Sequence, residues 1–266
     1  SIYLFHQMNF STLYLWGVFG IFGMNSVSTK KLRYMASSHY HPSTPNQREY
    51  VKTLQNTDKS MVVAIGPAGS GKTLFACIQA IELLKNSDIR KIVITRPLVS
   101  VQEEELGFLP GNIVNKMDPW TRPVLDIFTE FYSIGDINNF IKCGVLEIAP
   151  LAFMRGRTFH DTFVLADEMQ NSSPSQMLML ATRMGHNSKL VLTGDLAQSD
   201  RPSSFYKNGG NHANGLQEFI DKFYVHKLHV GKDIAERDID IIQLDRSDVK
   251  RSSLVSHVLD IYDSPC

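Results

Sequence analysis

One eight-residue stretch, Gly66-Pro-Ala-Gly-Ser-Gly-Lys-Thr73, has the spacing G-x-x-x-x-G-K-T of a phosphate-binding loop. The glycines allow backbone N–H groups to point inward at phosphate oxygens, and a following helix directs its positive N-terminus at the same anion. Lys72 is expected to reach the β- and γ-phosphates of a nucleoside triphosphate, and Thr73 to ligate Mg²⁺. A chance glycine-rich turn is the alternative, but the stretch lies between a predicted strand and a predicted helix. We therefore predict phosphate binding by Gly66, Pro67, Ala68, Gly69, Ser70, Gly71, Lys72 and Thr73.

A second stretch, Phe163-Val-Leu-Ala-Asp-Glu168, is an apolar run that ends in two adjacent acids. Asp167 is expected to hold the magnesium ion, usually through water. Glu168 is then placed to orient the attacking water or to take a proton from it. An exposed acidic strand end is the alternative, but the phosphate-binding loop earlier in the chain favours the catalytic interpretation. The paired acid indicates a hydrolase site more than a GTPase switch.

A third polar group follows the next apolar run, in Leu192-Thr-Gly-Asp-Leu-Ala-Gln198. We expect Thr193, Asp195 and Gln198 to lie at the rim beside the γ-phosphate, because Thr193 ends a predicted strand and the other two follow it. Gln198 is the candidate for a hydrogen bond to that phosphate, so that it would respond to the loss of the phosphate. A polar turn that caps the next segment is the alternative interpretation.

Short apolar runs alternate with helical patterns from about residue 46 onward. Such alternation predicts an α/β fold: a single RecA-like P-loop NTPase domain with a mostly parallel sheet and helices on both faces. Ligands of these sheets bind at the carboxyl ends of the strands, where all three motifs fall. Residues 98–144 are a mixed region in which Phe108–Gly111 and Asp118–Trp120 are expected to be turns. The predicted strands are 61–65, 91–95, 145–149, 162–166 and 189–193, and the predicted helices are 73–85 and 175–184.

Composition and charge exclude several classes of protein. Lys+Arg and Asp+Glu are both 27, so the formal net charge is zero, and bulk charge gives no support for nucleic-acid binding, although a local patch would be enough. Three cysteines without paired spacing argue against a disulfide scaffold or a zinc site, and the nine histidines form no metal-binding pattern. A reducing compartment is the simplest interpretation, so we expect a cytoplasmic protein with no membrane partner.

The first 42 residues differ from the rest. The apolar run 13–22 is shorter than the roughly 20 residues that span a bilayer, and the basic residues follow it, which disfavours a signal peptide. We interpret residues 1–42 as a leader of uncertain status, either disordered or a translated upstream stretch, with Met8, Met24 and Met35 as candidate initiators. The predicted domain then covers residues 43–266.

The motifs together resemble the PhoH family of P-loop ATPases over residues 43–262, and this family is similar to the nucleotide-binding half of superfamily 1 RNA/DNA helicases. Two positions depart from the family pattern, with Met169 in place of a common Ala and Ser252 in place of the usual His. The family name refers to phosphate starvation, which these residues do not encode. The motifs that carry the resemblance are TPNQREYV (44–51), GPAGSGKT (66–73), ITRP (94–97), LGFLPG (106–111), DPWTRP (118–123), EIAPLAFMRGRTF (147–159), DEMQN (167–171), SQMLMLATRMG (175–185) and LTGDLAQSD (192–200).

The resemblance implies roles for several further residues. Gln47 looks like the glutamine that recognises the adenine edge, and a surface glutamine at a helix start is the alternative. Arg96 lies in a motif similar to one that touches the nucleic-acid backbone in helicases, with a local acid as its alternative partner. Arg155 and Arg157 are candidates for phosphate of RNA or DNA, or of a neighbour's nucleotide, and otherwise are ordinary surface arginines. Arg183 and Arg251 are candidates for an arginine finger or a γ-phosphate contact, and otherwise pair within the fold.

ATP and Mg²⁺ are thus the expected ligands, and two functional classes remain open. The first is an ATPase that binds or remodels RNA, or another single-stranded nucleic acid, with helicase-like activity. The second is an ATP-driven switch that docks proteins, and a small-molecule kinase is a distant third because no acceptor-binding lid is apparent. A helicase motor normally closes two domains around the nucleotide, so one domain predicts a homo-oligomer, plausibly a ring, with an arginine supplied in trans.

Overall fold

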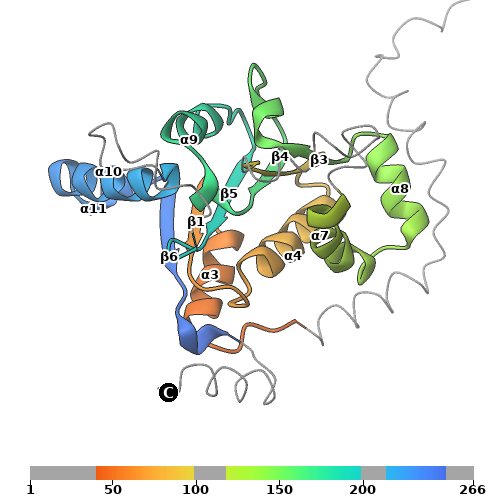
Figure 1. Ribbon diagram of the computed structural model, residues 1–266, viewed down its shortest axis with the longest axis horizontal. Helices are drawn as coiled ribbons and strands as arrows, with labels where there is room; N and C mark the ends of the chain where they lie inside the picture. Colours follow the sequence, from red (N-terminus) through yellow and green to blue (C-terminus); the bar gives the residue numbers. More distant parts are fainter. Residues whose placement is uncertain (1–39, 99–117, 199–213, 250–266) are drawn as a thin grey trace, which may run out of the picture. The chain divides into compact units, whose positions relative to one another are not determined.

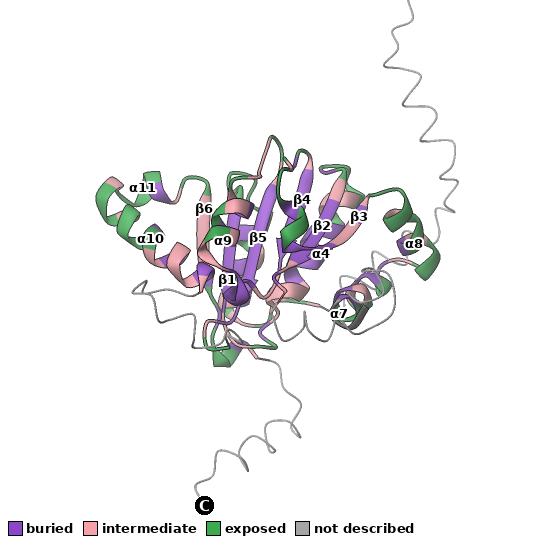
Figure 2. Ribbon diagram, turned by 45° about the horizontal axis from the view of Figure 1, so that its top comes forward, coloured by how far each residue is buried: buried purple, intermediate pink, exposed green. Residues whose placement is uncertain are grey.

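The computed structural model describes residues 40–98, 118–198 and 214–249. Six parallel strands form one sheet in the order β3-β2-β4-β5-β1-β6 (Figure 1). The four central strands are almost entirely buried, which is expected of parallel strands covered on both faces (Figure 2). The strands are β1 (Met61–Ile65), β2 (Lys91–Arg96), β3 (Leu146–Pro150), β4 (Thr162–Ala166), β5 (Lys189–Gly194) and β6 (Ile239–Gln243).

One face of the sheet is covered by α3 (Pro45–Gln55) and α4 (Lys72–Lys85), and α7 (Asp118–Thr129) packs against α4 (Figure 1). α8 (Ile134–Lys142) follows α7 and lies beside β3. Thr44 caps the N-terminus of α3, with Pro45 in the first turn, where a missing N–H costs no intrahelical bond. At the other end of α3, the Lys189 ammonium donates to the carbonyl oxygens of Leu54 and Asn56 at 2.6 and 2.7 Å. Burial lowers the pKa of Lys189 to about 8, so these two carbonyls compensate for lost water.

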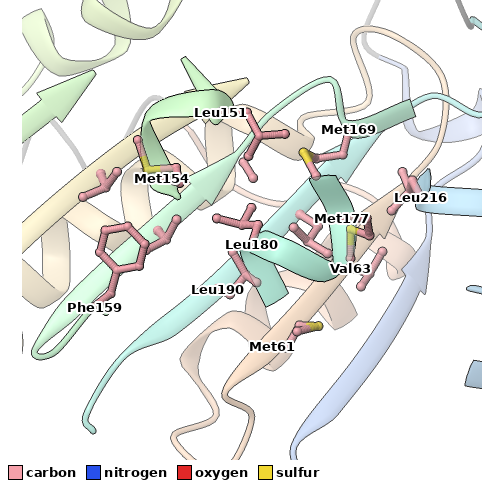
Figure 3. Packing of buried hydrophobic residues seen from close by; sticks show 14 of the residues in the cluster. Met61, Val63, Leu151, Met154, Phe159, Met169, Met177, Leu180, Leu190 and Leu216 are labelled. Atoms are coloured by element: carbon pink, nitrogen blue, oxygen red, sulfur yellow. The ribbon is translucent and has the colours of Figure 1, made fainter. Parts of the chain in front are cut away.

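The opposite face is covered by α9 (Pro174–Ala181), α10 (Gly215–Val230) and two short 3₁₀ turns, η1 (Leu151–Met154) and η2 (Met169–Asn171). α11 (Lys232–Ala235) continues from α10, and a third 3₁₀ turn, η4 (Arg246–Asp248), follows β6. Apolar side chains from these elements interdigitate with alternate strand residues in the main core (Figure 3). Its fully buried members include Val63, Leu151, Met154, Met169, Leu180, Leu190 and Leu216.

These observations confirm the predicted α/β class with helices on both faces of a parallel sheet, and all five predicted strands are present. The predicted turn at Asp118–Trp120 is wrong, because Asp118 begins α7, and a proline is tolerated in the first turn of a helix. The helix predicted for 175–184 ends at Ala181, where Thr182 caps it. The pattern missed β6, whose Asp240 interrupts the apolar run on an edge strand, as well as α3, α7, α8, α10 and α11. The predicted turn at 108–111 lies outside the described residues.

All described strands and helices lie in the unit Pro42–Cys266. The boundary predicted at residue 42 stays a prediction, because residues 1–39 lie outside the described part of the chain. Within the described ranges, no helix combines the length and the apolar character needed to cross a bilayer.

Candidate functional site

The loop 66–73, called the phosphate loop below, follows β1 at the carboxyl edge of the sheet. Gly66, Gly69 and Gly71 all have positive φ, a backbone region that L side chains rarely adopt. A Cβ at Gly66 would lie 2.4 Å from the carbonyl oxygen of Leu244, and one at Gly71 would lie 2.7 Å from the ring of Phe75. Gly71 caps α4, so the N–H groups of the first turn of α4 open toward the loop. The structure thus gives the predicted strand–loop–helix context of an anion cradle.

Lys72 is held against its own loop. Its ammonium donates to the carbonyl oxygens of Gly66 at 2.7 Å and Pro67 at 2.8 Å. Burial lowers the pKa of Lys72, and the carboxylates of Asp195, Glu168 and Asp167 partly offset that shift. The ammonium is therefore bonded to neutral carbonyls, which the oxygens of an anionic ligand could replace.

Asp167 joins the phosphate loop to the two neighbouring strands. Its Oδ1 accepts hydrogen bonds from the hydroxyls of Thr73, at 2.9 Å, and Thr193. Its backbone N–H donates to the carbonyl oxygen of Thr95 at 2.8 Å, which fixes the carboxylate at the end of β4. A carboxylate and a hydroxyl are hard oxygen donors of the kind that Mg²⁺ prefers, so Thr73 and Asp167 fit the predicted metal. Sequence analysis placed Thr193 beside the γ-phosphate, and the structure places it on Asp167.

Glu168 occupies a left-handed backbone conformation, with φ 55° and ψ 38°, at the start of η2. Such a conformation is uncommon for a non-glycine residue and is concentrated at functional sites. The Gln170 side chain donates to Oε2 of Glu168 at 2.5 Å and accepts from the backbone N–H of Asp195 at 3.1 Å. A Cβ at Gly194 would lie 2.9 Å from Oε1 of Gln170, so this glycine leaves room for the bridge.

Gln170 is a site residue that sequence analysis did not single out. It belongs to the quoted motif DEMQN, but its type and spacing do not distinguish it from an ordinary turn residue. Its role becomes visible only because η2 brings it between Glu168 and the end of β5. Tyr50 on α3 was also missed, and its hydroxyl donates to the backbone oxygen of Lys72 at 3.0 Å.

Asp195 and Gln198 lie in the turn after β5. The Asp195 carboxylate is nearly buried and accepts from the N–H of Ala197 at 3.0 Å. The Gln198 backbone N–H donates to the carbonyl oxygen of Asp195, while its side chain is exposed. The Asp195 carboxylate is close enough to Lys72 to raise the pKa of that ammonium group. The Gln198 side chain makes no hydrogen bond to another described residue. The γ-phosphate contact of Gln198 stays a prediction.

Gln47 is buried, with 3% of its surface exposed, in the first turn of α3. Its Nε2 donates to the carbonyl oxygens of Ser70 at 3.1 Å and Asp248 at 2.9 Å. Its Oε1 accepts from the N–H of Ser43 at 2.9 Å and from the Ser43 hydroxyl at 3.1 Å. The alternative of a surface glutamine is wrong on burial, although the helix start is correct. The adenine contact stays a prediction.

The candidate arginines occupy different environments. Arg157 forms a bidentate ion pair with Glu147 at 2.6 and 2.8 Å, and its guanidinium lies 4.9 Å from the ring centre of Phe159. Arg183 donates from Nε to the carbonyl oxygen of Met179 at 3.1 Å, at the end of α9. Arg155 is exposed, Arg96 is half-buried at the end of β2, and Arg251 lies outside the described residues.

The described His, Cys, Asp and Glu side chains can also be compared with the groupings that hold a metal ion. Among residues 40–98, 118–198 and 214–249, no group of three His, Cys, Asp or Glu side chains is placed to hold a metal ion. The two described cysteines, Cys77 and Cys143, are free thiols. Burial raises the pKa of the Cys77 thiol far above its ordinary value, which makes a reactive thiolate unfavourable.

Comparisons with known proteins agree with this geometry. The chain is 41% identical over 220 residues to a PhoH-like protein of Bacillus subtilis (strain 168), covering 83% of this chain and 63% of the relative. It is 36% identical over 220 residues to a PhoH-like protein of Synechocystis sp. (83% and 61% covered) and 33% identical over 218 residues to Protein PhoH of Escherichia coli (strain K12) (81% and 56% covered). The chain thus spans about three fifths of the length of these curated relatives.

A solved structure of the DUF1998 helicase MrfA bound to DNA matches with a TM-score of 0.43 and 9% sequence identity, covering 83% of this chain and 30% of the helicase. The family profile described as PhoH-like protein matches residues 39–263, which is most of the chain. With the phosphate loop, Asp167 and Glu168 in place at the sheet edge, the conclusion is that this chain belongs to the PhoH family of P-loop ATPases.

Proposed function

We propose that the chain binds ATP with Mg²⁺ and hydrolyses it. The observation that carries this proposal is the hydrogen bond from Thr73 to Asp167, because it joins the two predicted metal ligands, one at the start of α4 and the other just after β4. The phosphate loop and the N-terminus of α4 supply N–H groups for the phosphates. When bound, Mg²⁺ would neutralise charge on the phosphates, and Thr73 and Asp167 would hold it.

Lys72, Glu168 and Gln170 are assigned separate roles in the hydrolysis. Lys72 exchanges its loop carbonyls for phosphate oxygens and stabilises the charge that develops during phosphoryl transfer. Glu168 orients the attacking water or accepts its proton, and its half-buried carboxylate lies one residue from Asp167. Gln170 keeps Glu168 in position through its hydrogen bond.

We further propose that turnover is coupled to single-stranded RNA or a similar nucleic acid. Arg155 is exposed at the end of η1, and Phe153, two residues earlier, is 52% exposed. An exposed aromatic ring can stack on a base, and a neighbouring guanidinium can contact phosphate. Both residues follow β3 at the carboxyl edge of the sheet, the edge that carries the nucleotide site.

The alternative function is an ATP-driven switch that docks another protein. Its support is an exposed apolar surface on α10 and α11 that includes Leu228, 85% exposed, with Tyr224, Val225 and Ile234. Apolar groups gathered on a surface mark interaction sites. This surface would also serve the proposed homo-oligomer, in which a neighbouring copy supplies the arginine finger.

ATP hydrolysis by the purified protein, measured with and without single-stranded RNA, tests these proposals. We expect RNA to raise a turnover that both Lys72→Ala and Glu168→Gln abolish, and the RNA effect to fade at high salt. Hydrolysis through the same residues without an RNA effect would favour the protein switch. Binding of ATP without turnover at any oligomeric state would contradict the role of Glu168. Light scattering with an ATP analogue tests the oligomer, and a monomer under all conditions would exclude it.

A further inference from the structure

The segment that follows β6, residues 244–249, lies directly against the phosphate loop, and we call it the C-terminal strap. The backbone N–H of Leu244 donates to the carbonyl oxygen of Ile65 at 2.8 Å, just before the loop begins. Gly66 is packed so closely on Leu244 that a Cβ at Gly66 would collide with it. A methyl carbon of Val249 lies 3.3 Å from where a Cβ of Gly69 would be. The strap therefore forms one wall of the phosphate loop.

Asp248 fastens this strap to the start of α3. Its side chain is fully buried, yet its carboxylate accepts from Nδ2 of Asn46 at 3.0 Å, from the Thr44 hydroxyl, and from the N–H of Asp245 at 2.7 Å. A buried carboxylate is costly unless donors satisfy it, and here three donors come from both segments. The strap and the first turn of α3 are consequently joined as one unit.

Gln47 connects that unit to the phosphate loop. One of its N–H groups donates to Asp248 on the strap and the other to Ser70 in the loop, while Ser43 supplies both donors to its Oε1. A glutamine amide has two donor hydrogens and two acceptor lone pairs, so all four positions are in use.

Recognition of adenine by a glutamine uses the same atoms. The amide oxygen accepts from the adenine N6 amine while the amide nitrogen donates to N7. Gln47 could make that pair only by giving up bonds to Ser43 and to either Ser70 or Asp248, in a site with 3% exposure. Leaving a buried carbonyl without its donor is unfavourable, because the carbonyl loses its hydrogen bond without regaining water.

We propose that Gln47 is a positioning residue, which holds the phosphate loop against the strap, and that the site selects its nucleotide by the triphosphate and not by the adenine edge. The substrate class is then nucleoside triphosphates with little regard to the base. This inference rests on the proposed nucleotide site and replaces one expected contact within it.

Binding of three Mg²⁺-loaded ligands to the full chain tests the proposal by calorimetry: ATP, GTP and inorganic triphosphate, which has no base. Gln47→Met keeps the length of the side chain and removes its hydrogen bonds. We expect this variant to weaken all three ligands by a similar factor, about tenfold, because the two bonds by which Nε2 links the phosphate loop to the strap are among those lost. The exposed Glu49→Gln on the same helix is the matched control and should bind like the wild type.

Asp248→Asn is a second test variant, at a residue whose side chain is committed to the strap and to the start of α3 and is not a candidate for contact with the base. It removes the carboxylate charge and places an amide against the donors of Asn46 and Asp245. We expect the same parallel loss, and the double variant Gln47→Met/Asp248→Asn should lose less than the sum of the two. Thermal unfolding of each variant separates weaker binding from loss of the fold.

A loss confined to ATP, with GTP and inorganic triphosphate unaffected, would overturn the proposal in favour of adenine recognition. So would folded variants that bind all three ligands like the wild type. Failure of the wild type to bind any of them would instead overturn the proposed nucleotide site, which keeps the two failures apart.

Discussion

The centre of the sheet and its β3 edge hold charged side chains in opposite ways. At the centre, Lys72 is bonded to carbonyl oxygens and Asp167 to hydroxyls, and neither forms a direct ion pair with another residue of the described ranges. At the edge, Glu147 is bound by both Arg157 and Lys91 at 2.6 Å. The central charges are oriented by neutral dipoles and stay available to a ligand. The edge charges satisfy one another, and their contribution is to stability.

The largest expected effect comes from removing a central charge. Asp167→Asn keeps the shape of the side chain but removes the negative charge that would hold magnesium, so we expect ATP turnover to fall by about 10²-fold or more. Thr193→Val is the matched variant, because it removes a hydrogen bond to Asp167 and leaves the charge. Steady-state hydrolysis over a range of Mg²⁺ concentrations measures both. Equal losses for the two variants would show that orientation, not charge, matters at this position.

A smaller effect is expected from Gln170→Leu, which removes the bridge between Glu168 and Asp195. We expect kcat to fall by about tenfold with KM little changed, since the lost hydrogen bond positions the water-orienting acid and not the phosphate loop. Gln176→Leu is a control in α9, where the side chain accepts from the Ser173 N–H away from the site. A change in KM alone would contradict the positioning role of Gln170.

The ion pairs of Glu147 at the β3 edge should make the free energy of unfolding depend on pH. The hydrogen bond from Arg157, helped by Lys91, lowers the pKa of Glu147 from 4.5 to about 2 against the opposing effect of burial. The carboxylate is thus favoured in the folded state, so its stabilisation is full above pH 4.5 and is lost as pH falls toward 2.

Glu147→Gln should therefore lower the free energy of unfolding by about 1 to 2 kcal/mol at pH 7, allowing for partial exposure, and by less at pH 3. Urea unfolding at the two pH values measures the difference. ATP turnover at pH 7 should be unaffected in molecules that are folded. A destabilisation that is the same at both pH values would mean that packing, and not the ion pair, is lost.

The smallest effect separates the two arginines of the MRGR motif. Arg155 is exposed and Arg157 is paired, so Arg155→Ala should weaken RNA binding and reduce its salt slope by about one, whereas Arg157→Ala should leave the slope unchanged. Fluorescence anisotropy with labelled single-stranded RNA over a salt series measures both slopes. A reduced slope for Arg157→Ala would show that the edge ion pair opens to admit RNA.

The catalytic edge could be predicted because its signals are local. The phosphate loop needs glycines at fixed spacing, and the acids of Asp167 and Glu168 must follow an apolar strand, so type and order were enough. The edge strand β6 could not be predicted in this way, because its sequence shows no clear apolar run. β6 carries Asp240 and pairs with β1 from almost 180 residues away, and its strand character comes from that pairing.

The sequence by itself determined the family, the parallel α/β fold and the positions of the phosphate loop and the paired acids. Only the tertiary structure decided which hydrogen-bond and ion-pair partners the polar side chains have. It bonded Thr193 to Asp167, bonded Gln170 to Glu168, and paired Arg157 with Glu147. It also used the amide nitrogen of Gln47 for the strap and the loop and the amide oxygen for Ser43. The physical reason is that a hydrogen bond depends on which atoms are brought within about 3 Å, and folding sets those distances between residues far apart in the chain.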